Sequence, residues 1–344
     1  MTQSTQADPS AVAEASRARG EVGKRSLLAK IGAQNLILLG AIVLLSVLLS
    51  VLNPSFLLPA NLITIGTAVT ISGLLAVVQT VVMIMGGIDL TVGSVAGLAS
   101  VVSAMVFTAT NSTLGVLTAI LIGALCGLIN AIVIVIGRVP PMIATLAGLT
   151  AFKGVSQLIS DGRAQGYTGA DPLFRALARG SFLGIPTLVW VLIVTSVALH
   201  VLLRYTKIGR NIYAVGGNDR AARLSGIDIN RYIIGVFVVS GMVAAVAGLL
   251  ITARTGSGQP VSGSEGLEFQ AITAAALGGV ALRGGKGSIG GCILAVVLLG
   301  ILLNGMTLLG VNPFWQNLAQ GVLLVVAVVV QQSRSGERRV GLPK

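Results

Sequence analysis

Charge, histidine and cysteine are all scarce in this sequence, and each shortage excludes a class of protein. Charged residues make up 10% of the 344 residues, whereas soluble domains contain about 25%. A Ser-His-Asp triad or a histidine-rich metal site would have to be built around the single imidazole of His200. The two cysteines, Cys126 and Cys292, lie in apolar runs far from any CxxC spacing, which indicates packing residues. We therefore expect no enzyme, no metal site and no cofactor in this chain.

Long apolar runs take the place of these groups, since 54% of the residues are hydrophobic. A helix that spans a bilayer needs about 20 mostly apolar residues, and such runs recur along nearly the whole chain. The predicted fold class is therefore all-α, a polytopic membrane protein of about ten transmembrane helices that are broken at glycine-rich motifs. The expected spans are 34–52, 63–85, 92–108, 115–136, 142–159, 186–203, 232–252, 268–282, 288–308 and 314–331.

Residues 34–331 are expected to form one membrane domain between two cytoplasmic tails, a flexible one at 1–33 and a short one at 332–344. The net charge of +12 is typical of membrane orientation rather than of nucleic-acid binding, because most Lys and Arg lie between the apolar spans. With both termini inside, 18 Lys and Arg fall in the inside segments and 4 in the outside loops. This bias favours that orientation.

Asp89, in the stretch GGIDLTVGS at 86–94, is the only charged residue between Gln34 and Gly137. An ionised side chain near the centre of a bilayer costs roughly 2.5–3.5 kcal/mol, so its presence needs a reason. One interpretation makes Asp89 a cap at the N-terminus of the third span, where a carboxylate accepts free backbone amides. The other gives it a role in a transport pathway or its gate. The candidates for the pathway or gate in this stretch are Gly86, Gly87, Asp89 and Thr91.

A second glycine-rich stretch, GGVALRGGKGSIGG at 278–291, also follows an apolar run and precedes another. A phosphate-binding loop of the Walker type would need glycine in place of Val280 and Ser or Thr in place of Gly287, so that motif is absent. We interpret the stretch as a helix break where small residues let helices approach closely. Its likeness to 86–97 hints at two similarly built halves, an arrangement in which transporters place broken helices beside the pathway.

The stretch from Arg204 to Tyr232 is the longest predicted cytoplasmic loop. Gly216 and Gly217 are expected to make a turn, and Asn218 is expected to cap a short helix from Asp219 to Leu224 that Ser225-Gly226 ends. A short amphipathic helix between two spans suits docking into a groove of a soluble partner.

Four motifs in order, GGIDLTVGS, IGRNIYAVGGNDRAARLSGIDI, SGQP and LGGVALRGGKGSIGG, resemble the permease subunit of ribose-type ABC importers, over roughly residues 34–331. The resemblance implies a channel formed by two permease copies in the bacterial inner membrane. It also implies an extracytoplasmic sugar-binding protein and a separate tandem ATPase that carries ATP and Mg²⁺. The family usually has Ser where Thr91 stands, and the hydroxyl is kept. The residues that it implies for coupling to the ATPase, within the loop 204–231, are Gly209, Arg210, Gly216, Gly217, Asn218, Asp219, Arg220, Arg223 and Gly226.

A neutral polyol can be passed by weak hydrogen bonds, and the spans offer few cations for an anionic cargo. Further pathway candidates are therefore Gln79, Asn130, Gln270 and Asn304, each with the alternative of an interhelical hydrogen bond. Charged residues of the outside loops are candidates for docking the binding protein, with ordinary solvated loop charge as the alternative. These are Arg163, Arg175, Arg179, Arg254, Glu265 and Glu268.

The function expected from these residues and the resemblance is ATP-driven import of a monosaccharide such as ribose. One alternative is the same machinery for a nucleoside or a signalling sugar. A second alternative, an ion-coupled secondary carrier, is disfavoured because Asp89 is the only charge in the first four spans. A third is a membrane scaffold that docks a soluble partner through residues 216–226.

Overall fold

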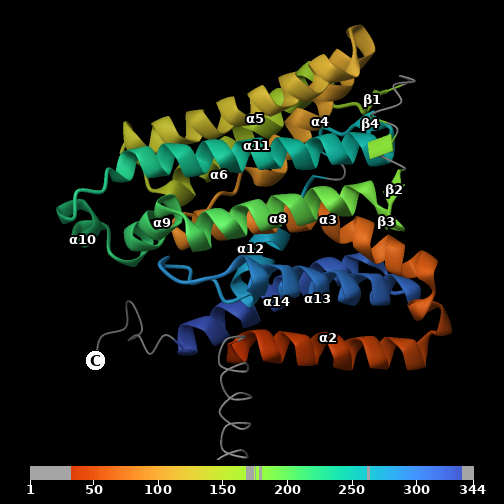
Figure 1. Ribbon diagram of the computed structural model, residues 1–344. Coiled ribbons are helices and arrows are strands. Elements are labelled where there is room, and N and C mark those ends of the chain that lie inside the picture. Colours follow the sequence, from red (N-terminus) through yellow and green to blue (C-terminus); the bar gives the residue numbers. More distant parts are fainter. Residues whose placement is uncertain (1–31, 168–173, 175, 178–179, 262–263, 335–344) are drawn as a thin grey trace, which may run out of the picture.

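The computed structural model describes residues 32–167, 174, 176–177, 180–261 and 264–334, and it is a bundle of roughly parallel and antiparallel helices (Figure 1). Among the described residues, eight helices are long and apolar enough to cross a membrane. They are α2 (Ala33–Leu52), α3 (Pro59–Ile84), α4 (Val92–Ala109), α5 (Ser112–Val135), α6 (Pro141–Ser160), α8 (Thr187–Tyr205), α11 (Ile229–Thr255) and α13 (Ile289–Leu308).

Two further apolar helices occupy the places of the eighth and tenth expected spans. The tenth is α14 (Pro313–Arg334), which agrees closely with the expected 314–331. The eighth, expected at 268–282, is only α12 (Leu267–Leu277), because the chain leaves the helix at Gly278. Its 11 residues are about half of what a bilayer requires.

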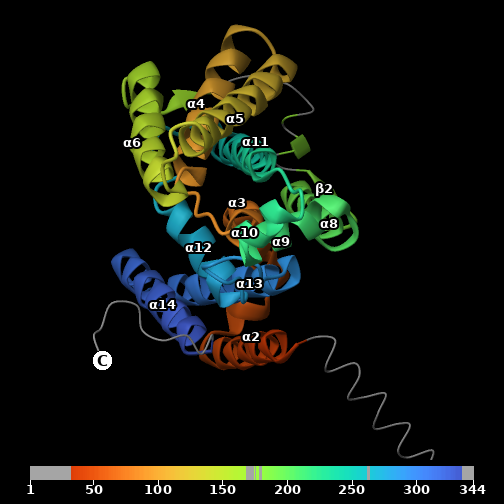
Figure 2. The same cartoon turned by 90° about the vertical axis from the view of Figure 1, so that its left-hand side faces the viewer.

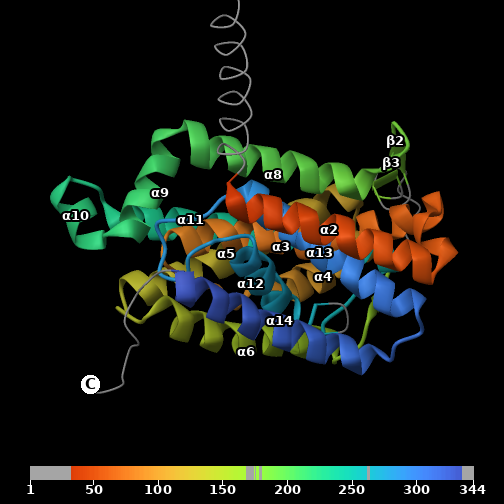
Figure 3. The same ribbon diagram turned by 90° about the horizontal axis from the view of Figure 1, so that it is seen from below.

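The remaining elements that the structure describes lie at the two ends of the bundle (Figures 1 and 3). At one end are α9 (Lys207–Gly217) and α10 (Asp219–Leu224), and α10 projects beyond the other helices. At the opposite end are the 3₁₀ helix η1 (Pro54–Leu57) and four two-residue strands, β1 (Gln165–Gly166), β2 (Ser181–Phe182), β3 (Ile185–Pro186) and β4 (Ser257–Gly258). The strands form two antiparallel pairs, β1 with β4 and β2 with β3.

Local sequence signals explain where several helices begin and end. Proline occupies the first turn of α3 and α6, where its missing N–H is not needed. The Asn111 side chain caps α5 by accepting from the Leu114 amide, and Ser288 caps α13 by accepting from Gly291. Gly256, in the left-handed region at φ 71°, ends α11.

Glycines allow the central helix α11 to pack closely against α5 and α4. A Cβ atom on Gly123 would lie 2.3 Å from the Gly241 carbonyl oxygen, and one on Gly127 would lie 2.1 Å from that of Phe237. The pair Gly123 and Gly127 therefore forms a packing seam, as small residues do between membrane helices. Cys126 and Cys292 are both buried and free, as their place in apolar runs predicted.

The chain before α12 runs beside α4 without forming a helix. The Gln259 amide donates to the Ser100 hydroxyl (3.0 Å), so a buried side chain satisfies a backbone group that a helix would have satisfied internally. Further along, Ser264 packs against Gly97 and Glu268 against Gly93. In the end-on view of Figure 2, α12 lies between α6 and α14 on one side of the bundle.

Candidate functional site

Asp89 lies in the extended turn between α3 and α4 and is 2% exposed. Its Oδ1 accepts hydrogen bonds from the Thr91 amide (2.9 Å) and the Thr91 hydroxyl (2.5 Å). Its Oδ2 accepts from the Ser240 hydroxyl on α11 (2.6 Å). No Lys or Arg that the structure describes pairs with this carboxylate. Three hydrogen bonds, of which the two from hydroxyl groups are short, therefore take the place of a counter-ion.

Two amide side chains complete the surroundings of Asp89. Gln79 on α3 is fully buried and pairs with the Asp89 backbone, its amide nitrogen donating to the carbonyl (3.1 Å) and its oxygen accepting from the N–H (3.2 Å). Asn130 on α5 donates from Nδ2 to the Thr91 hydroxyl (2.9 Å). Four predicted pathway candidates thus meet in one network that links α3, α4, α5 and α11. The bond from Asn130 to Thr91 joins α5 to the N-cap of α4, which is the interhelical alternative that the sequence left open for Asn130. Gln79 instead binds the turn that follows its own helix.

The prediction that Asp89 caps the third span is wrong in its detail. The N-cap of α4 is Thr91, whose side chain makes no capping bond, and Asp89 lies two residues before it. The carboxylate accepts one backbone amide, that of Thr91 itself, and otherwise binds hydroxyl groups. Ser240 on α11 was missed because nothing near it in the sequence points to residue 89.

Five glycines from three separate segments meet where α3 ends, and we call this cluster the glycine junction: Gly86, Gly216, Gly217, Gly284 and Gly285. The Gly285 amide donates to the Ile84 carbonyl (2.7 Å). A Cβ atom on Gly216 would lie 1.9 Å from the same carbonyl oxygen, and one on Gly284 would lie 2.8 Å from the Gly86 Cα. Gly86 and Gly284 both have φ near 90°, which other residues rarely adopt.

The predicted turn at Gly216 and Gly217 is wrong, because both residues belong to the last turn of α9. Gly216 is required by the close contact at the junction, where a Cβ atom would strike the Ile84 carbonyl, whereas a Cβ atom on Gly217 would lie 4.0 Å from the Gly285 Cα. Gly87 is buried just beyond the junction, and its amide donates to the Val82 carbonyl (3.0 Å) as α3 ends.

The short helix predicted after the junction is confirmed as α10. The Asn218 side chain accepts from the Ala221 amide, and Gly226 follows the helix at φ 79°. Arg220 and Arg223 are exposed on it. Leu224, 90% exposed, offers an apolar contact at the same tip. The helix borders an open cleft of about 720 Å³ that is also lined by Asp219, Arg283 and Lys286.

Hydrogen bonds hold in place helix α9, which directly precedes α10 in the chain. The Thr206 hydroxyl accepts from the Gly209 amide (3.1 Å), and a side chain on Gly209 would strike the Leu203 carbonyl. Arg210 is exposed. The Tyr213 hydroxyl donates to the Gly287 carbonyl (2.8 Å), which joins α9 to the 278–291 stretch. Burial raises the pKa of the Tyr213 phenol, against a smaller lowering by Arg204, so this donor keeps its proton.

The other two pathway candidates lie elsewhere, in a cavity of about 270 Å³ between α3, α12, α13 and α14. Asn304 exchanges two hydrogen bonds with Asn61, at 3.1 and 2.9 Å, which again is an interhelical bond. Gln270 also lines the cavity, and its side chain makes no hydrogen bond to any residue that the structure describes. The polar pathway candidates that the sequence predicted together therefore lie in two separate places, the network around Asp89 and this cavity.

The residues predicted to dock the binding protein differ in their exposure. Arg163 and Arg254 are exposed near the end of the bundle opposite α10, while Arg175 and Arg179 lie outside the described residues. The prediction is wrong for Glu268, which is 6% exposed and packs against Gly93. Glu265 is exposed, but its carboxylate already pairs with Lys153.

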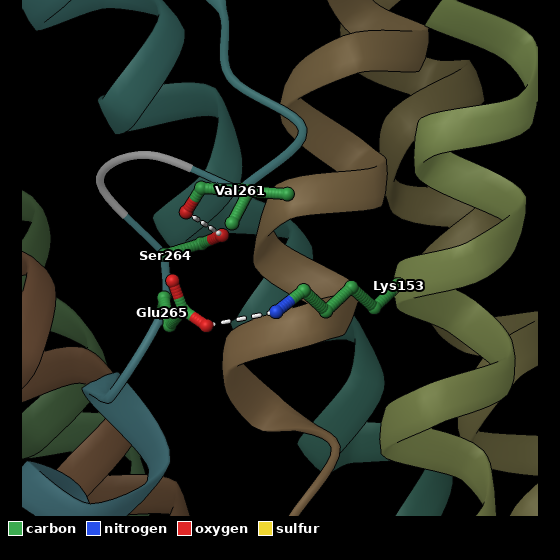
Figure 4. A network of polar contacts seen from close by, with 4 residues as sticks. All are labelled: Lys153, Val261, Ser264 and Glu265. Carbon is green, nitrogen blue, oxygen red and sulfur yellow. Dashed lines mark hydrogen bonds and ion pairs between the residues drawn. The ribbon is translucent and has the colours of Figure 1, made fainter. Parts of the chain in front are cut away.

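Lys153 on α6 reaches past α4 to Glu265, and the Lys153 Nζ lies 2.8 Å from the Glu265 Oε1 (Figure 4). Their side chains are 35% and 66% exposed. The pair ties α6 to the non-helical chain before α12. Lys153 lies within the fifth expected span, 142–159, and the sequence does not identify its partner because the two residues are far apart in the chain.

The sequence matches a family model described as branched-chain amino acid transport system / permease component over residues 61–328. The ribose import permease protein RbsC of Bacillus subtilis is 39% identical over 293 residues, which is 85% of this chain and 91% of that protein. The corresponding protein of Escherichia coli K12 is 37% identical over 297 residues, 86% of this chain and 92% of its own. The L-arabinose ABC transporter permease protein AraH of Azospirillum brasilense is 37% identical over 338 residues, 98% of this chain and 97% of its own. No solved structure matches the chain.

Proposed function

The chain belongs to the family of branched-chain amino acid transport system permease components, and we propose that it is the membrane-spanning permease subunit of an ATP-driven importer for a monosaccharide. Although the family is described by amino acid transport, the relatives named above carry the names of ribose and L-arabinose permeases and are similar over most of their length. A pentose or a related sugar is therefore the proposed cargo.

The glycine junction is the observation that supports an energised mechanism best. At the junction, Gly216 at the end of α9, which leads into the projecting helix α10, lies in close backbone contact with Ile84 at the start of the turn that carries Asp89. The Gly285 amide is bonded to the same Ile84 carbonyl, so the contact is made by backbone and not by flexible side chains. A displacement of α10 by a partner therefore reaches the Asp89 turn directly. We propose that a tandem ATPase engages α10 through Arg220, Arg223 and Leu224, and that ATP and Mg²⁺ are bound there and not in this chain.

The remaining features of the proposal concern placement. The α10 end of the bundle is the cytoplasmic end, as the distribution of Lys and Arg favours, and both termini lie on that side of the bacterial inner membrane. The opposite end receives a sugar-binding protein, for which Arg163 and Arg254 are exposed. Two copies of the chain form the channel.

Isolation of the tagged full chain from its native membrane, followed by mass spectrometry of the proteins that accompany it, tests this proposal first. We expect a tandem ATPase and a sugar-binding protein. Liposomes that hold the recovered complex should then accumulate labelled D-ribose or L-arabinose only when ATP is supplied on the α10 side. Uptake by the chain alone, driven by an ion gradient, would instead show a secondary carrier.

A further inference from the structure

The polar side chains that line the cavity between α3, α12, α13 and α14 are all uncharged. Hydroxyl and amide side chains line it, and no charged residue does so among the residues that the structure describes. The amides are those of Gln270, Asn304, Gln316 and Gln320. Uncharged groups that both donate and accept hydrogen bonds suit a neutral polyol and do not compensate the charges of an amino acid or a phosphate.

Two of these amides have unused hydrogen-bonding capacity. Asn304 is bound to Asn61, and Gln316 donates to the Thr307 hydroxyl (3.1 Å). By contrast, the side chains of Gln270 and Gln320 make no hydrogen bond to any described residue, although both are only partly exposed and both line the cavity. Such amides at membrane depth are costly unless something polar meets them.

The rest of the lining is apolar and is contributed mainly by α13, with Val296, Leu299 and Leu303. A sugar ring presents hydroxyl groups around its rim and C–H groups on its faces, so it needs a site with both kinds of wall. Water occupies about 30 Å³ per molecule in the liquid, so the cavity of about 270 Å³ holds roughly nine water-sized groups, close to the size of one pentose.

The polar groups are also arranged along the direction of transport. Thr64 is near the start of α3, Thr307 near the end of α13 and Gln316 near the start of α14, all at the end of the bundle opposite α10. Gln270 lies on α12, deeper in the bundle. A solute that enters between the helix ends can therefore exchange one set of hydrogen bonds for the next as it moves inward.

We propose that this cavity is a low-affinity site for a single monosaccharide within each copy of the chain, in which Gln270 and Gln320 bind the sugar hydroxyls. The site rests on the proposed function and adds to it a place inside the permease itself where the sugar is held after release from the binding protein. Weak binding suits it, because a conduit must release what it admits.

Saturation-transfer NMR with D-ribose and L-arabinose, on the full chain alone in lipid nanodiscs, tests the site directly. We expect transfer to the sugar with the wild type and about a tenfold weaker signal with the double variant Gln270→Leu and Gln320→Leu, since two hydrogen-bonding partners are lost. Gln157→Leu is the matched control, because Gln157 is an exposed amide on α6 outside the cavity, and its signal should equal the wild type. Gel filtration of each variant verifies that it is folded.

The same variants in the assembled importer separate this site from the proposed function. The double variant should lower the maximal rate of ATP-driven uptake and leave the sugar concentration at half-maximal rate unchanged, because the binding protein sets the latter. ATP-driven sugar uptake with no saturation transfer to the wild type, or with equal transfer to the double variant, would overturn the site and leave the importer intact. Failure of the complete complex to take up any sugar would instead overturn the proposed function.

Discussion

The amide of Gly285 and the carbonyl of Ile84 are joined by a hydrogen bond of 2.7 Å, although the two residues belong to helix breaks in different halves of the chain. Gly216, at the end of α9, packs against both partners of this bond. The two glycine-rich motifs that look alike in the sequence are therefore in contact, and the third segment between them leads to the projecting helix α10.

Gly216→Ala should uncouple the junction. Its methyl group would lie 1.9 Å from the Ile84 carbonyl oxygen and 2.7 Å from the Gly285 nitrogen, so backbone must move. We expect a loss of roughly 1–3 kcal/mol in stability, as overpacking usually costs, together with strongly reduced uptake per inserted molecule. Gly154→Ala is the control, because a Cβ atom there meets nothing within 4 Å. Equal melting temperatures and uptake rates for both variants would contradict the role of the junction.

Asp89→Asn should insert correctly but transport poorly. The amide keeps an acceptor oxygen for Thr91, yet its nitrogen cannot accept the bond from Ser240. Ser240→Ala removes the same bond and leaves the carboxylate in place, so comparison of the two variants separates the charge from the bond. Uptake and melting temperature are the measurements. Normal uptake by Asp89→Asn would leave this residue a purely structural role.

The double variant Arg220→Glu and Arg223→Glu should abolish energised uptake without affecting insertion. Both side chains are exposed on α10 and hold no ion pair within the described residues, so reversal of their charge alters only what docks there. Recovery of the ATPase with the tagged chain measures the effect. Lys207→Glu serves as control, because Lys207 is also an exposed cation and lies at the start of α9. Full ATPase recovery with the double variant would remove α10 from the proposed interface.

Exchange of the charges of Lys153 and Glu265 should show that their contact is specific. Lys153→Glu alone places two carboxylates together and should lower the melting temperature, whereas Lys153→Glu with Glu265→Lys should restore it in part. Because both side chains are partly exposed, the coupling in a double-mutant cycle is expected at about 0.2–1 kcal/mol. Additive effects of the two single changes would show that the pair contributes nothing.

Sequence reasoning located most of the helices because each span carries its own signal, a long apolar run. It located α10 for a similar reason, since Asn218 and Gly226 mark its ends within nine residues. It overestimated the length of α12 because residues 278–282 are as apolar as the helix before them, and only the backbone at Gly278 shows where the helix stops.

The candidate site was harder to predict, since its bonds cross the bundle. The local pattern GGIDL marked Asp89, but Ser240 is an ordinary serine in an apolar span until α11 packs against α4. Glu268 was placed outside by its charge and is buried by the path of the chain before α12. Residue type thus identifies polar side chains that need a partner within the bundle, whereas the packing of the helices determines which residue that partner is.

The half-length of α12 also bears on how the protein enters its membrane. Eleven residues are too few to partition into lipid as an independent helix, and the chain just before them needs the Ser100 hydroxyl to satisfy its backbone. This segment therefore cannot leave the insertion machinery by itself. It has to insert together with its neighbours in the sequence, α11 and α13, after α4 is already in place. This part of the bundle is therefore completed late in biogenesis.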